Sequence, residues 1–246
     1  NRFGEGGNGM TETVQITGRE RSYTIHLHTG GVTDIVIVYL TMPRDIAELS
    51  DLYQRILEQS GNQAYTMLSV EITDWNGELT PWEFQESNGK MSFAGRGERL
   101  LADLEQSIIP GVCQQFGIDR EQSRFAIAGY SLAGLFSVWT MYQTKLFQGA
   151  ASCSGSLWYP GFLQYAFEHE LKRECALYFS LGDKEEKVRN PYMAKVGKAT
   201  EALSEHYLDE DKVEHMVFEW NAGNHFQQVD ERIVKGMAWV LRQCRR

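Results

Sequence analysis

The sequence predicts an α/β fold, in which a mostly parallel sheet is covered by helices on both faces. Short apolar runs alternate along the chain with longer segments of helical character, an order typical of parallel sheets. One of these runs, Asp34 to Leu40, is short, apolar and β-branched, as expected for a strand buried on both faces. The 246 residues contain no internal repeat, low-complexity segment or linker, so we expect a single domain over residues 1–246.

The N-terminal part of the chain is expected to form an antiparallel edge of this sheet. Residues 1–10 are rich in glycine and are predicted to be a loose leader. Val14 to Thr17 and Tyr23 to His28 have the composition of two strands, joined by a polar turn over residues 18–21.

The middle of the chain is expected to contain a helix, a strand and a second, broken helix. A helix from Ile46 to Gln59 stops at Gly61, and a strand over 65–72 follows. Residues 75–97 hold two tryptophans, a proline and four glycines, and are expected to be irregular. A helix over 98–116 should break or kink near Pro110.

The C-terminal half continues the alternation of strands and helices. A strand over Arg124 to Ala128 leads directly into a helix. The later predicted elements are strands near 150–153, 176–181 and 213–220 and helices near 162–171, 191–207 and 226–242.

Composition and charge limit the classes of partner. The formal net charge of −9 argues against nucleic acid and anionic membrane surfaces, and no apolar run approaches the roughly 20 residues of a membrane span. The four cysteines lack C-x-x-C spacing, which argues against a zinc site and favours a reducing, cytoplasmic location. No signal peptide is visible, although the sequence starts at Asn1.

The segment Gly129-Tyr130-Ser131-Leu132-Ala133-Gly134 has the features of a nucleophile elbow, a sharp turn from a strand into a helix. Such a turn holds its serine in a strained conformation with the hydroxyl exposed. It requires small residues two positions away on either side, and Gly129 and Ala133 meet that demand. The alternative is a serine that merely caps a buried helix.

A serine nucleophile needs a histidine to take its proton. His225 directly follows the last predicted strand, at the carboxyl edge of the sheet where the elbow must also lie, and is the best candidate. Its alternative role is to cap or pack the last helix. His26 and His28 are expected on a solvated strand face, and the other three histidines lie among charged residues.

The acid that orients the histidine is expected in the loop Gly182-Asp183-Lys184-Glu185-Glu186, at the same edge. Each of its three carboxylates could instead be a solvated loop charge. The chain order serine, acid, histidine is that of α/β-hydrolases. An oxyanion hole would use the backbone N–H of Leu132 and a second one near Thr41 or Met42, although no H-G-G-type signature occurs there.

With these residues in place, the chain resembles the esterase D and enterobactin esterase group of α/β-hydrolases. The resemblance runs from Tyr23 onward. It is carried by the segments 129–136, Ser154-Gly155-Ser156-Leu157-Trp158, 182–186 and Gly223-Asn224-His225. The group's G-x-x-[DE] pattern selects Glu185 as the acid, with Asp183 as the alternative.

The resemblance also implies substrate contacts. Segment 154–158 resembles the group's cleft lining, so Trp158 is expected to stack on substrate, with core packing as the alternative. Trp75 and Trp82 belong to a segment, 75–97, that is expected to cap the cleft, with pinning of a surface loop as the alternative. Tyr130, beside the serine, completes the predicted substrate contacts.

The expected function is a serine hydrolase that needs no metal or cofactor and cleaves small carboxylic esters through an acyl-enzyme. Siderophore lactones, short acyl esters and thioesters are all candidate substrates, although the acidic balance gives no support to a strongly anionic one. An acyltransferase with the same triad and a non-catalytic binding module are the alternatives. The sequence does not indicate which ester is cleaved or the oligomeric state.

Overall fold

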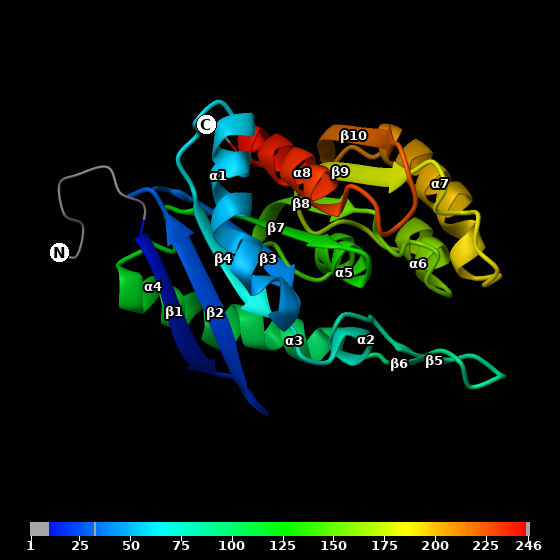
Figure 1. The fold of residues 1–246 in the computed structure, drawn as a ribbon, viewed down its shortest axis with the longest axis horizontal. Helices are drawn as coiled ribbons and strands as arrows, with labels where there is room; N and C mark the ends of the chain where they lie inside the picture. The colour runs from blue at the N-terminus through cyan, green and yellow to red at the C-terminus, as the bar shows by residue number, and fades with distance from the viewer. Residues whose placement is uncertain (1–9, 32, 245–246) are drawn as a thin grey trace.

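A single eight-stranded sheet runs through the computed structural model, which describes residues 10–31 and 33–244 (Figure 1). The strands are β1 (Met10–Thr17), β2 (Ser22–Thr29), β3 (Ile35–Thr41), β4 (Thr66–Glu71), β7 (Arg124–Tyr130), β8 (Phe147–Cys153), β9 (Cys175–Gly182) and β10 (Val213–Asn221). Their order is β1-β2-β4-β3-β7-β8-β9-β10. Strand β2 runs antiparallel to both of its neighbours, β1 and β4, and all the other neighbouring pairs in this sheet are parallel. The predicted mostly parallel sheet with an antiparallel edge is therefore confirmed.

Central strands of the sheet are more deeply buried than the edge strand β1. Every residue of β3 is buried, because helices cover both faces of this central strand. The edge strand β1 alternates between partly buried and exposed residues over most of its length. It begins at Met10, so the last residue of the predicted leader belongs to the sheet. Residues 1–9 of that leader lie outside the described residues.

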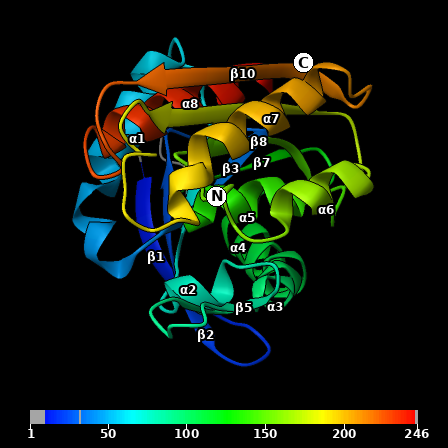
Figure 2. The same cartoon turned by 90° about the vertical axis from the view of Figure 1, so that its right-hand side faces the viewer.

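Helices form one layer on each face of the sheet (Figures 1 and 2). On one face, α1 (Leu49–Gln59) and α8 (Val229–Gln243) pack in a cluster with Ile37, Ala126 and Tyr178. The other face carries α3 (Gly97–Asp103), α4 (Ile109–Phe116), α5 (Leu132–Thr140), α6 (Phe162–Glu168) and α7 (Val196–Leu208). Short 3-10 helices, Pro43–Glu48 and Met193–Lys195, precede α1 and α7.

The predicted break near Pro110 takes the form of a π-helical turn, Leu104–Ile108, between α3 and α4. Proline has no N–H to donate, and its ring would clash with the carbonyl of the residue four positions earlier in a continuous helix. The wider π turn directly before α4 places Pro110 in the first turn of a new helix, where proline is tolerated.

Residues 75–97 are more regular than the sequence suggested. They form a short helix, α2 (Trp75–Glu78), and a hairpin of β5 (Glu83–Gln85) and β6 (Ser92–Ala94). In Figure 1 this hairpin extends beyond the end of the sheet to which the parallel strands point. Gly95 has a φ of +66°, and a Cβ there would lie 2.1 Å from the backbone carbonyl carbon of Trp82, so only glycine fits this close approach.

The prediction of a solvated face for His26 and His28 is wrong, because both side chains are buried. Strand β2 is not at the edge: it lies between β1 and β4, and α1 covers this face. His26 places its two ring nitrogens 3.0 Å from Thr13 Oγ1 and 2.7 Å from Glu71 Oε1. His28 stacks on Tyr53, and burial lowers its pKa.

All four cysteines are buried, and none of them forms a disulfide in the structure. Cys153 ends β8 and Cys175 begins β9, so both are core residues. Within the described part of the chain, no helix has the length and apolar character needed to cross a membrane.

Candidate active site

Ser131 lies between β7 and α5 with φ 60° and ψ −122°, the strained geometry predicted for the elbow. A Cβ at position 129 would lie 2.4 Å from the Cβ of Ala133, so the turn tolerates alanine at 133 because 129 is glycine. The backbone carbonyl of Ser131 accepts hydrogen bonds from Gly134 and Leu135, while its side chain makes no capping bond. The capping alternative is therefore wrong.

The hydroxyl of Ser131 lies beside a histidine. The Nε2 atom of His225 is 3.0 Å from Ser131 Oγ, and its Nδ1 atom is 2.8 Å from Glu185 Oε2. With a proton on Nδ1 donated to Glu185, Nε2 is free to accept the serine proton. The structure thus brings together three residues from the loops after β7, β9 and β10.

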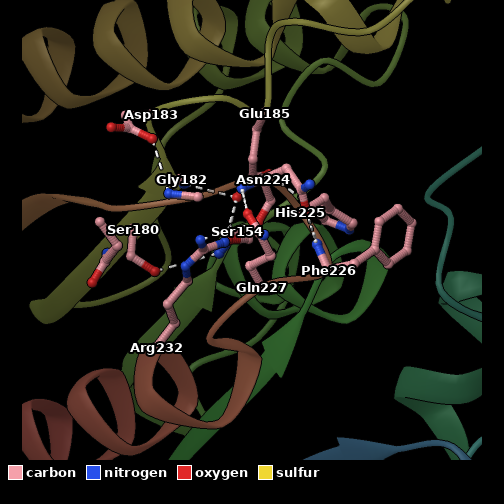
Figure 3. A network of polar contacts seen from close by, with 12 residues as sticks. Ser154, Ser180, Gly182, Asp183, Glu185, Asn224, His225, Phe226, Gln227 and Arg232 are labelled. Atoms are coloured by element: carbon pink, nitrogen blue, oxygen red, sulfur yellow. Dashed lines mark hydrogen bonds and ion pairs between the residues drawn. The ribbon is translucent and has the colours of Figure 1, made fainter.

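Glu185 is held as a buried carboxylate (Figure 3). Its Oε1 atom accepts hydrogen bonds from Ser154 Oγ at 2.6 Å and from the backbone N–H of Gly182 at 2.8 Å. Burial by itself would raise the pKa of Glu185, but the hydrogen bond and charge of His225, with the bonds from Ser154 and Gly182, outweigh it and lower the pKa. Glu185 is therefore ionised at neutral pH.

The other two acids of this loop have different surroundings. Asp183 is exposed, and its Oδ1 atom accepts a hydrogen bond from the Gly223 N–H at 2.9 Å, which braces the turn that carries His225. Glu186 is also exposed and lies against Gly197 at the start of α7. Of the three carboxylates, only Glu185 contacts the histidine.

Arg232 of α8 is a site residue that the sequence analysis missed. It is fully buried, and its Nη1 donates to Glu185 Oε1 at 2.8 Å, to Ser154 Oγ at 3.0 Å and to the hydroxyl of Tyr130 at 2.9 Å. Its Nη2 donates to two carbonyls of the loop before His225, at 3.1 Å each. Figure 3 shows this guanidinium reaching from α8 into the network. One guanidinium thus holds both the acid and the histidine loop.

Tyr130 does not line the cavity at Ser131, contrary to the predicted substrate contact. It is buried, and its hydroxyl donates to the backbone carbonyl of His225 at 2.9 Å. Burial raises its pKa to about 12, so the hydroxyl keeps its proton for this bond. Side chains alternate between the two faces of the sheet along β7, and the Tyr130 side chain lies on the face where its hydroxyl contacts Arg232 rather than the cavity.

The predicted oxyanion donors have different surroundings. Leu132 is the first residue of α5 and lines the cavity, and a helix offers no internal partner to its first N–H groups. Thr41 ends β3 and Met42 follows it, next to the elbow, because Leu40 pairs with Gly129. Neither Thr41 nor Met42 lines the cavity, so the second donor stays a prediction.

A cavity of about 310 Å³ opens at Ser131. Trp75 and Trp158 line it, as predicted, and so do Met91 and Phe93 of the hairpin segment. Trp82 does not: its Nε1 donates to the Pro160 carbonyl at 2.9 Å, and its ring packs against tyrosines of the segment 159–165. Trp82 therefore pins segment 75–97 to the body of the domain, the alternative role considered for it.

No protein-family model matches the chain. The uncharacterized protein YbbA of Bacillus subtilis is 22% identical over 197 residues, which cover 77% of this chain and 78% of YbbA.

Solved structures share the fold at low sequence identity. The siderophore hydrolase EstA from Aspergillus nidulans has a TM-score of 0.77 at 15% identity, covering 96% of this chain and 95% of EstA. An IroE-like serine hydrolase from Shewanella oneidensis has a TM-score of 0.78 at 13% identity, covering 94% of this chain and 79% of that protein. The enterobactin esterase FES from Shigella flexneri has a TM-score of 0.71 at 17% identity, covering 95% of this chain but 60% of FES. The predicted resemblance to this group is thus confirmed at the level of the fold.

Proposed function

We propose that this chain is a serine hydrolase that cleaves carboxylic esters through an acyl-enzyme intermediate. The observation that carries the proposal is the continuous line of contacts from Ser131 Oγ through the His225 ring to Glu185, at 3.0 and 2.8 Å. These distances fall within the range of a nucleophile hydrogen-bonded to its base and a base hydrogen-bonded to its orienting group.

In the proposed reaction, Ser131 Oγ attacks the ester carbonyl while Nε2 of His225 takes its proton. The ionised Glu185 fixes the tautomer of the ring and stabilises its positive charge. The backbone N–H of Leu132 donates to the oxyanion of the tetrahedral intermediate. His225 then protonates the departing alcohol, which leaves an acyl group on Ser131.

Water completes the cycle. His225 takes a proton from the water as it attacks the acyl-enzyme, and returns that proton to Ser131 Oγ as the carboxylic acid departs. The names of the structurally similar proteins, a siderophore hydrolase and an enterobactin esterase, support hydrolysis of an ester rather than transfer to another alcohol.

Labelling with a fluorophosphonate probe tests the nucleophile. We expect one covalent adduct, located at Ser131 by peptide mass spectrometry, and no adduct in Ser131→Ala. Ser123→Ala, at a serine outside the cavity, is the matched control and should label like the wild type. If the wild type is not labelled, the binding-module alternative is favoured. If the protein converts its substrate to a new ester rather than to the free acid when an alcohol is present, the acyltransferase alternative is favoured.

A further inference from the structure

Most of the side chains that line the cavity at Ser131 are apolar. The large ones that are buried or half-buried include Trp75, Phe93 and Trp158. The cavity volume of about 310 Å³ is at the lower end of the range for small-molecule sites. A cavity of this size and character fits one apolar group of a substrate rather than a large ligand in its entirety.

The cavity offers little positive charge. Lys90, an exposed residue of the hairpin segment, is the one Lys or Arg among the described residues that line it. The charge of Glu185 is already matched by Arg232 beneath the cavity floor, and that guanidinium is fully buried. An anionic group that entered the cavity would lose its hydration, and the exposed Lys90 is the one Lys or Arg of the described lining that could pair with it, so its burial is costly.

The rim of the cavity is apolar as well. Six large hydrophobic residues are exposed in the part of the chain that the structure describes, and three of them border this cavity: Phe226 (85% exposed), Val188 (43%) and Met193 (36%). Phe226 directly follows His225 and meets its ring edge-on, with ring centroids 5.3 Å apart. Exposed apolar residues gathered around a concave site mark a surface that binds an apolar partner.

We propose that the substrate is an uncharged ester with an aromatic or medium-length alkyl group that fills this cavity, while its other half lies against the rim. We expect polyanionic esters, including metal chelates that carry several negative charges, to be poor substrates. This inference rests on the proposed function, because it concerns the substrate of the same serine.

A matched pair of chromogenic esters tests the substrate class. p-Nitrophenyl valerate and mono-p-nitrophenyl glutarate have acyl chains of similar length and differ in a terminal methyl or carboxylate. We expect kcat/KM to be more than tenfold higher for the valerate. From p-nitrophenyl acetate to the valerate, kcat/KM should rise by up to about fourfold for each added methylene, the value for full burial of that group.

A charge placed on the rim should change this preference. Val188→Lys adds an ammonium at an exposed position beside the cavity, and should raise the ratio of glutarate to valerate kcat/KM by about two- to fivefold, as expected for an exposed ion pair. Leu208→Lys makes the same change at an exposed residue outside the cavity and should leave the ratio unchanged.

Fluorophosphonate labelling of the same samples separates the two proposals. If Ser131 is labelled but the glutarate is cleaved as well as the valerate, the substrate class is wrong and the hydrolase proposal stands. If Ser131 is not labelled and no ester is cleaved, the hydrolase proposal fails and the substrate class fails with it. Labelling with the expected order of esters supports both.

Discussion

Nη1 of Arg232 lies 2.8 Å from Oε1 of Glu185, so a fully buried cation from the last helix faces the acid of the site from below. The opposite oxygen of Glu185 accepts the bond from His225. The carboxylate is thus fixed from two sides, and its orientation toward the histidine does not depend on that one bond.

Removing this guanidinium should damage both stability and turnover. Arg232→Met leaves Glu185 buried without its cation, and we expect a loss of about 3–5 kcal/mol in the free energy of unfolding, measured with urea. Arg232→Lys keeps the charge but cannot make all five bonds, so its kcat should lie between those of Arg232→Met and the wild type, with little change in KM. Arg242→Met, near the end of the same helix, should change stability by no more than about 0.5 kcal/mol. A stable and fully active Arg232→Met would contradict this prediction.

Substitution of the two loop acids should separate their roles. Glu185→Gln removes the charge that orients and stabilises protonated His225, and kcat for p-nitrophenyl acetate should fall on the order of 10³- to 10⁴-fold. Asp183→Asn keeps an oxygen that can accept the Gly223 N–H, so we expect less than about a tenfold loss. The opposite order of the two losses would make Asp183 the acid.

The buried His28 should make stability depend on pH. Because burial, and to a lesser extent neighbouring His26, lowers the pKa of His28, the unfolded chain binds a proton here at pH values where the folded protein does not. The free energy of unfolding should therefore fall as the pH drops below about 6.5, until the lower folded pKa is passed. Urea titrations across this window should give a smaller slope for His28→Gln, whereas His215→Gln, at an exposed position, should keep the wild-type slope. An unchanged slope in His28→Gln would contradict the prediction.

The elbow should tolerate changes at one of its small residues and not at the other. Gly129→Ala would bring its Cβ to 2.4 Å from that of Ala133 and close to its backbone, and should cost about 1–3 kcal/mol and most of the activity. Ala133→Gly only removes a methyl group, so it should cost about 1 kcal/mol of helix stability and preserve turnover. Thermal melts and esterase assays of both variants test this. Equal effects at the two positions would be inconsistent with the close approach at Gly129.

The elements that sequence could predict are those with local signals. Gly129 and Ala133 flank Ser131 at the spacing that the turn requires, and His225 immediately follows an apolar run. The chain order of strands then places their loops at one edge of the sheet. Resemblance selected Glu185 from its loop, and its contact with His225 agrees with that choice.

Residues missed by sequence analysis act through contacts with distant parts of the chain. Arg232 lies on the buried face of α8 together with Gly236 and Val240. A charged residue on an otherwise apolar helix face was the one feature of the sequence that could have indicated a buried, paired arginine. The solvated face predicted for His26 and His28 ignored α1, which is brought onto β2 only by the tertiary fold. No pattern of neighbouring residues in the sequence indicates that Arg232 contacts the site or that α1 covers β2.

The hairpin of β5 and β6 had a local signal that was overlooked. Asn88-Gly89 is a frequent turn sequence. Here the N–H of Gly89 donates to the Glu86 carbonyl at 2.8 Å, and Gly89 has a φ of +70°, within the connection of residues 86–91 between the two strands. The flanking strands have only three residues each, too few to show a period of two. Their pairing depends on packing against the aromatic cluster around Tyr159.

Two separate parts of the chain line the cavity. Ser131, Glu185 and His225 follow strands of the main sheet. Lys90, Met91 and Phe93 belong to segment 75–97, between β4 and α3, which is held in place by the hydrogen bond from Trp82 to the Pro160 carbonyl. Exchanging segment 75–97 for one of different length or polarity would therefore change one wall of the cavity and leave the contacts among Ser131, His225 and Glu185 in place.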